Sequence, residues 1–206
     1  RKVFARHPAP VQITWIGYPG TTGIKAMDYI LMENTVLPGK NINAQFTEKI
    51  IRIPRSYAFD VEEQLPDVTE APCVNNNFIT FGSFNRLNKI NREVIALWCE
   101  VLRKLPDSRL QMAGMPSDGA PDELLTWFKE EEISEDRLYF YPRSGFVEYL
   151  KLHNQVDFCL DTFPYTGGTT TMHALWMGVP TLTLIGDTYP SAQGGAVNNR
   201  AGLSQY

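Results

Sequence analysis

The stretch VDFCLDTFPYTGGTTTMHALWMGVPTLTLI, residues 156–185, decides the fold. Its pattern predicts a buried strand over 156–160, a loop rich in glycine and threonine, a helix over 169–177 and a second buried strand over 181–185. Two strands joined through a helix form a βαβ unit, in which the strands run parallel. The stretch therefore predicts a parallel sheet with a functional loop at one end.

The loop between the first strand and the helix has the composition of an anion site. Gly167 and Gly168 carry no side chain, so the backbone can bend sharply and a ligand can approach it closely. Thr169 and Thr170 follow where the helix begins, beside the unpaired amides and the positive dipole end of its first turn. This combination favours a phosphate. On local physics alone, a tight turn with a capping threonine is an equally good interpretation.

The helix that follows the loop has two predicted faces. His173 comes four residues after Thr169, so both side chains lie on one face and we expect them to reach the same ligand. Met172, Leu175 and Trp176 have helical spacing and predict the stripe that packs on the core.

Composition excludes several classes of protein. No apolar run approaches the roughly 20 residues that a membrane helix needs. The 19 basic and 23 acidic residues give a net charge of −4, which is not the footprint of a nucleic-acid or anionic-membrane partner. The three cysteines, Cys73, Cys99 and Cys159, are far apart and indicate a reducing compartment, so we expect a cytoplasmic protein. The three histidines are scattered, and we expect no metal site.

The rest of the chain divides into three parts. Residues 1–55 contain three short apolar runs, over 11–16, 27–32 and 49–53, and residues 56–77 read as a linker because they combine prolines, asparagines and acidic residues without periodicity. Residues 78–206 alternate regularly between strands and helices, which predicts an α/β fold with a Rossmann-like, doubly wound parallel sheet. The expected strands are 78–84, 109–113 and 137–141, and the expected helices are 92–105, 122–132 and 146–153.

Polar residues in the loops after these strands are the site candidates, since doubly wound sheets bind ligands at the carboxyl ends of their strands. Lys89 supplies a positive charge suited to a diphosphate, although a solvated surface lysine is its alternative interpretation. Arg143 and Ser144 follow the strand over 137–141. Tyr149 has a ring that can stack on a base or, as is commoner, pack on the sheet. We expect these residues to converge with the Gly167–Thr170 loop.

Several segments together resemble one family, the O-linked N-acetylglucosamine transferases, also called glycosyltransferase family 41, in the bacterial form associated with tetratricopeptide repeats. They are HPAPVQITWIGYPGTTG at 7–23, FGSFNRLNKI at 81–90 and LDTFPYTGGTTTMHALWMGVP at 160–180. The resemblance implies a B-type glycosyltransferase fold, with the end of the N-terminal catalytic half in residues 1–55 and most of the C-terminal, nucleotide-sugar-binding half in 78–206. It also implies a fragment that is incomplete for catalysis and truncated at its C-terminus.

The resemblance further implies an inverting, metal-independent transfer of N-acetylglucosamine from UDP-N-acetylglucosamine to serine or threonine of a protein, without a cofactor. Lys89 matches the lysine that contacts the donor diphosphate and stabilises the leaving UDP. Thr169 and Thr170 match the diphosphate-binding threonines, with Gly167 and Gly168 shaping their loop.

Other positions match the nucleotide contacts or depart from them. Arg143 and Ser144 match the backbone that reads uracil, and Tyr149 matches the ring beside the uridine. His173 stands where the family usually has an acidic residue for the ribose hydroxyls, and an imidazole offers fewer acceptors than a carboxylate. Arg86 stands where a neutral amide is typical, which adds charge near the diphosphate.

Two alternatives to a transferase fragment remain at this point. One is a scaffold or interaction domain that kept the fold and lost the chemistry, which His173 favours and an intact Lys89 opposes. The other is an enzyme like UDP-N-acetylglucosamine epimerase. The sequence leaves the acceptor and the oligomeric state open.

Overall fold

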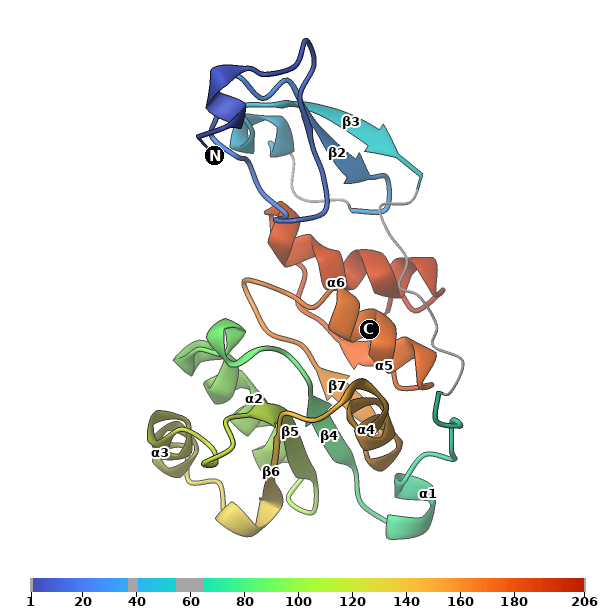
Figure 1. Ribbon diagram of the computed structural model, residues 1–206. Coiled ribbons are helices and arrows are strands. Elements are labelled where there is room, and N and C mark those ends of the chain that lie inside the picture. The colour runs from blue at the N-terminus through green and yellow to red at the C-terminus, as the bar shows by residue number, and fades with distance from the viewer. Residues whose placement is uncertain (1, 37–40, 55–64, 206) are drawn as a thin grey trace.

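The computed structural model describes residues 2–36, 41–54 and 65–205, which form two parallel sheets (Figure 1). The first sheet is the N-terminal unit, with strand order β1-β2-β3. Its strands lie near the three predicted runs, and β1 is much shorter than the predicted one. They are β1 (Ile13–Thr14), β2 (Tyr29–Glu33) and β3 (Lys49–Ile53), accompanied by the 3-10 turns η1 (Phe4–Arg6) and η2 (Ile42–Gln45).

The second sheet has five parallel strands in the order β6-β5-β4-β7-β8. The chain starts at the centre with β4, builds β5 and β6 on one side, and then returns to place β7 and β8 on the other. The order therefore reverses between β4 and β7, which makes this pair the topological switch point. The strands are β4 (Thr80–Ser83), β5 (Arg109–Met115), β6 (Leu138–Pro142), β7 (Phe158–Leu160) and β8 (Thr181–Leu182).

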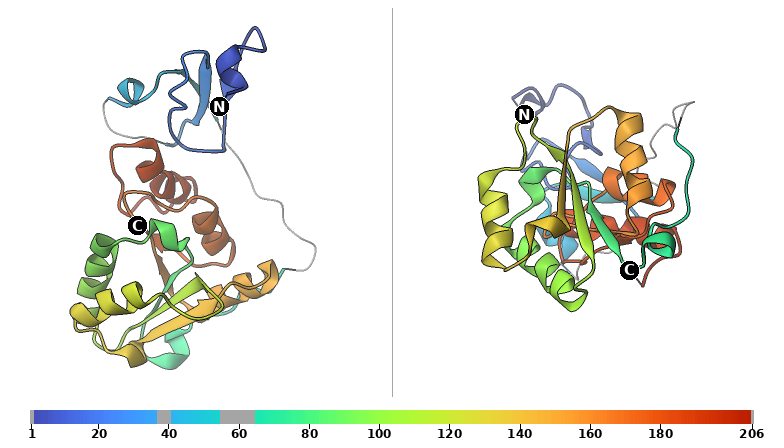
Figure 2. Two further views of the ribbon diagram at one scale, coloured as in Figure 1. Left: turned by 60° about the vertical axis from the view of Figure 1, so that its left-hand side comes forward. Right: turned by 90° about the horizontal axis from the view of Figure 1, so that it is seen from below.

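Helices cover both faces of this sheet (Figure 2). One face packs on α2 and α3, as Trp98, Leu110 and Phe128 show by sharing one buried cluster. The other face packs on α4 and α5 through a second cluster that contains Ala113 and Ala174. The doubly wound α/β prediction is confirmed. The helices are α2 (Arg92–Lys104), α3 (Asp122–Glu130), α4 (Phe146–Lys151), α5 (Thr169–Trp176) and α6 (Tyr189–Arg200), with 3-10 turns η3 (Leu87–Lys89), η4 (Glu135–Arg137) and η5 (Leu152–Gln155).

Helix α6 lies between the two sheets and joins them (Figure 1). Its residues Tyr189, Ala192 and Ala196 share a buried cluster with Met32 and Val36 of the N-terminal unit. Two polar contacts cross the same junction, a 2.7 Å ion pair between Arg200 and Glu33 and a 3.0 Å hydrogen bond from Gln45 Nε2 to the backbone oxygen of Asp187.

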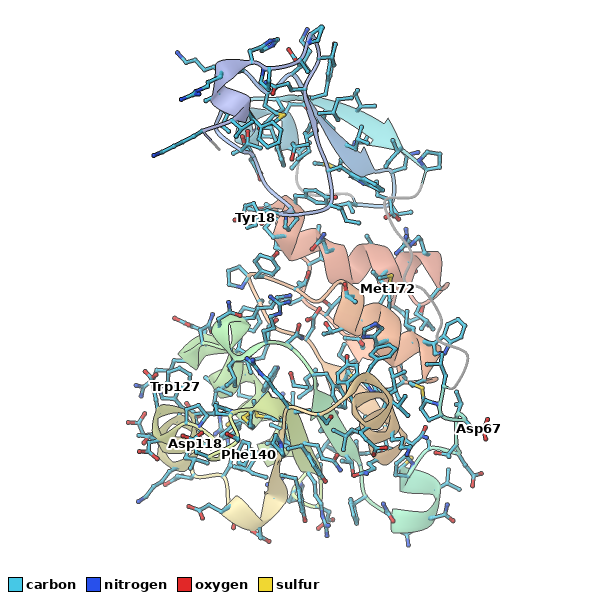
Figure 3. The ribbon with its side chains drawn as sticks, viewed as in Figure 1. Tyr18, Asp67, Asp118, Trp127, Phe140 and Met172 are labelled. Atoms are coloured by element: carbon cyan, nitrogen blue, oxygen red, sulfur yellow. The ribbon has the colours of Figure 1, made fainter. Side chains whose placement is uncertain are left out.

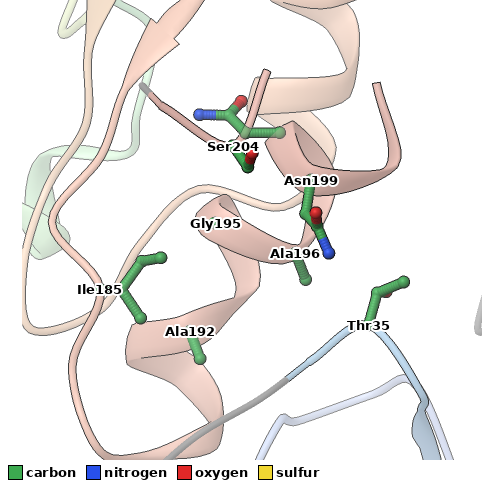
Figure 4. Close-up of a pocket in the computed structure, with 8 residues that line it drawn as sticks. Thr35, Ile185, Ala192, Gly195, Ala196, Asn199 and Ser204 are labelled. Atoms are coloured by element: carbon green, nitrogen blue, oxygen red, sulfur yellow. The ribbon is translucent and has the colours of Figure 1, made fainter. Parts of the chain in front are cut away.

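A cavity of about 220 Å³ lies at this junction (Figure 4). Thr35 of the N-terminal unit lines it opposite Ala192, Ala196 and Asn199 of α6. The small side chains of α6 leave this space because they cannot fill the gap to the loop after β2.

The predicted linker is only partly visible, since its residues 56–64 lie outside the described residues. Its last part contains a short helix, α1 (Cys73–Asn76). The Asp157 carboxylate accepts hydrogen bonds from the backbone N–H groups of Cys73 at 2.8 Å and Thr80 at 2.7 Å, which ties α1 to the start of β4. The bounds 1–55, 56–77 and 78–206 stay a prediction.

The predicted core stripe of α5 is wrong. Thr171 and Ala174 are the buried residues of this helix, whereas Trp176 is 46% exposed. Met172 and Leu175 are half-buried. Because α5 contacts α6 as well as the sheet, its small residues form the close contact and its large ones lie toward the flanks.

Candidate functional site

The candidate site lies where the loops after β4 and β7 meet, on either side of the switch point. Three side chains of the first loop bond to the second. Lys89 Nζ donates to the backbone oxygen of Thr166 at 2.8 Å, and Asn91 Nδ2 donates to that of Phe163 at 3.1 Å. Asn85 Nδ2 donates to Asp161 Oδ1 at 3.1 Å. The two loops therefore form one hydrogen-bonded unit at the carboxyl edge of the sheet.

Lys89 is held inside this unit. Its ammonium nitrogen lies 4.4 Å from the centroid of the Tyr165 ring, a cation–π contact. Burial lowers the pKa of Lys89, while the negative charge of Asp161 raises it and the positive charge of Arg86 lowers it further. The alternative interpretation of Lys89 as a solvated surface lysine is therefore wrong.

The Gly167–Thr170 loop is built around its first glycine. A Cβ on Gly167 would lie 2.5 Å from Thr171 Oγ1 and 2.8 Å from Thr170 Oγ1, so no larger residue fits without rearrangement. Residue Gly168 occupies the N-cap position of α5, and no side chain caps the helix. Thr170 Oγ1 donates instead to Asn85 Oδ1 at 3.2 Å. The predicted capping by a threonine is therefore wrong, and no side chain occupies the amides of the first turn of α5 as a cap. The anion site at this turn stays a prediction.

A cavity of about 590 Å³ opens beside these loops. Three predicted residues, Arg86, Arg143 and Tyr149, line it. Ser144 is exposed next to Arg143 but does not belong to the lining. No acidic side chain is part of the lining, so the described walls favour an anionic ligand. The remaining lining residues are Phe84, Asn85, Leu87, Asn88, Ala113 and Gly114.

His173 and Tyr149 face each other at the side of the site. His173 Nδ1 lies 3.2 Å from the hydroxyl oxygen of Tyr149, and their rings meet edge to face with centroids 5.5 Å apart. Phe146 adds a second edge contact to His173 at 5.2 Å. Burial lowers the pKa of His173 and raises that of Tyr149, so both groups are neutral near pH 7. Tyr149 packs among aromatic rings and also lines the cavity, so the packing role is confirmed and the stacking on a base stays a prediction.

Sequence reasoning missed Asp161 and Thr166, which hold the site together. The Asp161 side chain is buried and accepts hydrogen bonds from Thr162 N at 2.8 Å, Gly167 N at 2.7 Å and Thr183 Oγ1 at 2.7 Å, besides the Asn85 amide. Burial raises the pKa of Asp161, and these hydrogen bonds oppose the shift. An acidic residue directly after a buried strand, before a glycine loop, was the available signal.

The N-terminal unit presents a second loop, PGTTG at 19–23, that is ordered by Glu48. The Glu48 carboxylate accepts from Thr21 Oγ1 and Thr22 N, at 2.7 and 2.8 Å, and also from Thr22 Oγ1. Burial raises the pKa of Glu48, but the hydrogen bonds from Thr22 and Thr21 outweigh it, so the pKa is lowered. Tyr18, just before this loop, lies at the end of the unit that faces α6 (Figure 3).

Within residues 2–36, 41–54 and 65–205, no group of three or more histidine, cysteine, aspartate or glutamate side chains has the arrangement of a metal site. In the same residues, no helix has the length and hydropathy that crossing a membrane requires.

Comparison with known proteins identifies the family. The model of glycosyl transferase family 41 matches residues 1–78 and 72–202. The chain is 35% identical over 205 residues to the probable UDP-N-acetylglucosamine–peptide N-acetylglucosaminyltransferase SPINDLY of Hordeum vulgare, covering 98% of this chain and 22% of the relative. It is 30% identical over 193 residues to the probable enzyme SEC of Arabidopsis thaliana, covering 89% of this chain and 19% of that relative.

The fold has a close solved counterpart. A lysine-to-methionine mutant of the Thermobaculum terrenum O-GlcNAc transferase superposes with a TM-score of 0.84 at 34% identity, covering 98% of this chain and 38% of that one. The chain thus spans about a fifth of the length of the curated relatives. It belongs to glycosyl transferase family 41.

Proposed function

We propose that this chain is the UDP-sugar-binding part of a protein O-glycosyltransferase that transfers N-acetylglucosamine from UDP-N-acetylglucosamine to serine or threonine. The observation that carries the proposal is the position of Lys89, which the loop after β4 brings against the loop after β7. The matched relatives are described as UDP-N-acetylglucosamine–peptide N-acetylglucosaminyltransferases, which supports this donor and a protein or peptide acceptor. The 590 Å³ cavity beside Lys89 has the volume of a small-molecule site.

The proposed diphosphate position lies between Lys89 and the first turn of α5. An ammonium group, the Thr169 and Thr170 hydroxyls and the amides of a helix N-terminus all favour an anion there. The same chemistry suits the β-phosphate of UDP. Arg86, Arg143 and Tyr149 then border the nucleotide in the adjoining cavity.

The proposed reaction is an inverting displacement without a metal or cofactor. The acceptor hydroxyl oxygen forms a bond to the anomeric carbon from the side opposite UDP, and the bond from that carbon to the β-phosphate oxygen breaks. The bonding electrons leave with UDP, so negative charge grows on the β-phosphate, and the proton of the acceptor hydroxyl is released to solvent. Lys89 and the α5 amides stabilise this charge more in the transition state than in the ground state, which is the condition for catalysis.

A scaffold domain of the same family is the second candidate. The observation in its favour is the 3.2 Å contact of His173 with the Tyr149 hydroxyl, which occupies one ring nitrogen at the predicted ribose position. A domain of this kind would keep the fold without binding UDP. The two candidates therefore differ in whether the chain binds UDP.

Titration of UDP by calorimetry tests the proposal. Lys89→Ala, and a double variant with Thr169→Val and Thr170→Val, are each expected to lose about tenfold to a hundredfold in affinity, since a hydrogen bond to a charged group contributes about 1.5–3 kcal/mol. Lys104→Ala and Thr126→Val, which alter exposed residues of α2 and α3, serve as controls and are expected to bind like the parent. A folded parent that does not bind UDP would establish the scaffold candidate.

Other properties remain part of the proposal. We propose a cytoplasmic protein whose partners are a UDP-sugar and a protein acceptor, without nucleic acid or a membrane as partners. The net charge of −4 supports the absence of a nucleic-acid partner.

A further inference from the structure

Asp161 places a buried carboxyl group against the Gly167–Thr170 loop, since its Oδ1 accepts the Gly167 N–H. Its side chain is 5% exposed and lies at the end of β7, one of the two strands at the switch point. Burial of a carboxylate costs free energy, so its presence needs compensating interactions. The contacts of Asp161 show what these interactions are.

The carboxylate connects both loops of the site. Oδ1 accepts three N–H groups, from Asn85 Nδ2 of the loop after β4 and from the backbone amides of Thr162 and Gly167 in the loop after β7. Oδ2 accepts a hydrogen bond from the hydroxyl of Thr183, the residue that follows β8. Three of these four partners can only donate, and all three donate to Oδ1, so this oxygen carries no proton. The Thr183 hydroxyl at Oδ2 can donate or accept.

Two glycines make room for the carboxylate. A Cβ on Gly194 of α6 would lie 2.5 Å from Asp161 Oδ2, and a Cβ on Gly167 would lie 3.2 Å from Oδ1. The site thus brings together the loops after β4, β7 and β8 and one turn of α6 around a single side chain. A residue that served only to end the strand would not require this convergence.

Lys89 and Asp161 bind the two ends of one peptide group, since Lys89 Nζ donates to the Thr166 oxygen and the Gly167 N–H donates to Asp161 Oδ1. Burial favours the neutral amine, and the carboxylate charge favours the ammonium form. The other charged or titratable groups near this pair are Arg86, whose charge disfavours the ammonium form, together with Tyr165 and the buried Cys159. Among these, Asp161 is the group that opposes the effect of burial on Lys89.

We propose that Asp161 is a positioning residue of the donor site, whose ionised carboxylate fixes the Asn85 and Gly167 amides and supplies the counter-charge of the Lys89 ammonium group across the Thr166–Gly167 peptide. This inference rests on the proposed function. It adds that the affinity for UDP depends on a residue that does not touch UDP and that acts through the charge of Lys89 and the shape of the Gly167 loop.

Asp161→Asn tests the role because the amide keeps the size and one oxygen acceptor while removing the charge. We expect UDP affinity at pH 7 to fall at least about tenfold, which corresponds to about 1.4 kcal/mol. UDP binding decreases at high pH as Lys89 loses its proton, and in Asp161→Asn this decrease moves to lower pH. Thr183→Val is the matched control, since it removes one hydrogen bond and keeps the carboxylate. It is expected to leave unchanged the pH above which UDP binding decreases.

Two further measurements keep the test decisive if Asp161→Asn folds poorly. Asn85→Leu removes one of the three contacts between the loops, the one to Asp161, and keeps the charge. UDP affinity is expected to fall, while the pH above which UDP binding decreases stays in place. Carbon NMR of the Asp161 carboxyl group in the parent protein reports its ionisation directly. A carboxyl group that is protonated at pH 7, or an Asp161→Asn variant with the affinity and pH profile of the parent, would overturn the inference. A parent that fails to bind UDP overturns the proposed function instead, and the NMR measurement still reports the charge.

Discussion

The ammonium group of Lys89 donates a 2.8 Å hydrogen bond to the backbone oxygen of Thr166, which is fully buried. Thr166 is fixed in turn by α6. Its N–H and its hydroxyl donate to the Pro190 carbonyl oxygen at 3.1 and 2.9 Å, and Gly194 N donates to its hydroxyl oxygen at 3.0 Å. Lys89 therefore depends, through one residue, on the helix that also packs against the N-terminal unit.

Thr166→Val tests this dependence. The substitution keeps the shape and removes the hydroxyl, so the Pro190 carbonyl loses one donor and the Gly194 N–H loses this acceptor. We expect the free energy of unfolding to fall by about 1–3 kcal/mol, and UDP affinity to fall by about threefold to tenfold, or about 0.6–1.4 kcal/mol. Urea denaturation and calorimetry measure the two effects. Thr126→Val, an exposed control on α3, is expected to stay within about 0.5 kcal/mol, and an equal effect of both variants would contradict the prediction.

The order of elements and the βαβ unit could be predicted because they depend on local patterns. β3 has the predicted bounds, and α5 begins at Thr169 as predicted. The core stripe of α5 could not be predicted in the same way. Hydrophobic spacing assumes one buried face, whereas α5 packs on both the sheet and α6, so Thr171 and Ala174 are buried in place of Trp176.

The composition of the loops predicted the candidate site, but it did not predict the residues that hold these loops together. Lys89 and Gly167 stand in segments whose composition indicates an anion site. The contacts of Asp161 with Asn85 and Gly194 join residues far apart in sequence, and no local pattern signals that a glycine in the middle of a helix makes room for a carboxylate. Such contacts depend on the tertiary packing of α6.

Gly194→Ala is expected to destabilise the protein although alanine favours helices. The new Cβ would lie 2.5 Å from Asp161 Oδ2 and 2.6 Å from Thr183 Oγ1, and hydrogen bonds hold both atoms in place. Overpacking of this kind costs about 1–3 kcal/mol, more than the roughly 1 kcal/mol gained in helix propensity. Thermal and urea unfolding measure the change. Gly145→Ala, where a Cβ meets open space, is the control, and a stabilised Gly194→Ala variant would show that the carboxylate can move away.

The buried ring of His153 is expected to make the folded protein less stable at acid pH. Its ring is fully buried and stacks on Phe84 with centroids 3.8 Å apart, and burial lowers its pKa from 6.5 to about 4. Above pH 6.5 the ring is neutral in both the folded and the unfolded chain, so it leaves stability unchanged. Between pH 6.5 and about 4 the unfolded chain binds a proton that the folded chain does not, so about 3 kcal/mol of stability is lost over this range.

His153→Phe removes the titrating ring and keeps an aromatic side chain. Its free energy of unfolding is expected to fall less steeply with pH between 6.5 and 4 than that of the parent, by up to about 1.4 kcal/mol per pH unit. The lost contact of Nδ1 with the Tyr149 carbonyl lowers stability at neutral pH, so the slope and not the absolute value is the readout. Urea denaturation at a series of pH values gives this slope, and equal slopes in the two proteins would contradict the assignment to His153.

Arg200 makes the ion pair that joins α6 to the N-terminal unit, and Arg200→Ala is expected to cost about 3 kcal/mol of stability. The Glu33 side chain is 3% exposed and that of Arg200 is 25% exposed, so the substitution removes a charged partner from a buried carboxylate. The hydroxyl of Thr35 still donates to Glu33 and limits the loss.

Arg92→Ala is the control, since it breaks an exposed ion pair with Glu130. The side chains of Arg92 and Glu130 are 64% and 46% exposed, so the substitution is expected to cost at most about 1 kcal/mol. Because Glu33 ends β2 and Arg200 ends α6, hydrogen exchange in Arg200→Ala should increase at both elements. Equal unfolding free energies for the two variants would mean that the junction is held by the apolar cluster around Tyr189 and not by this ion pair.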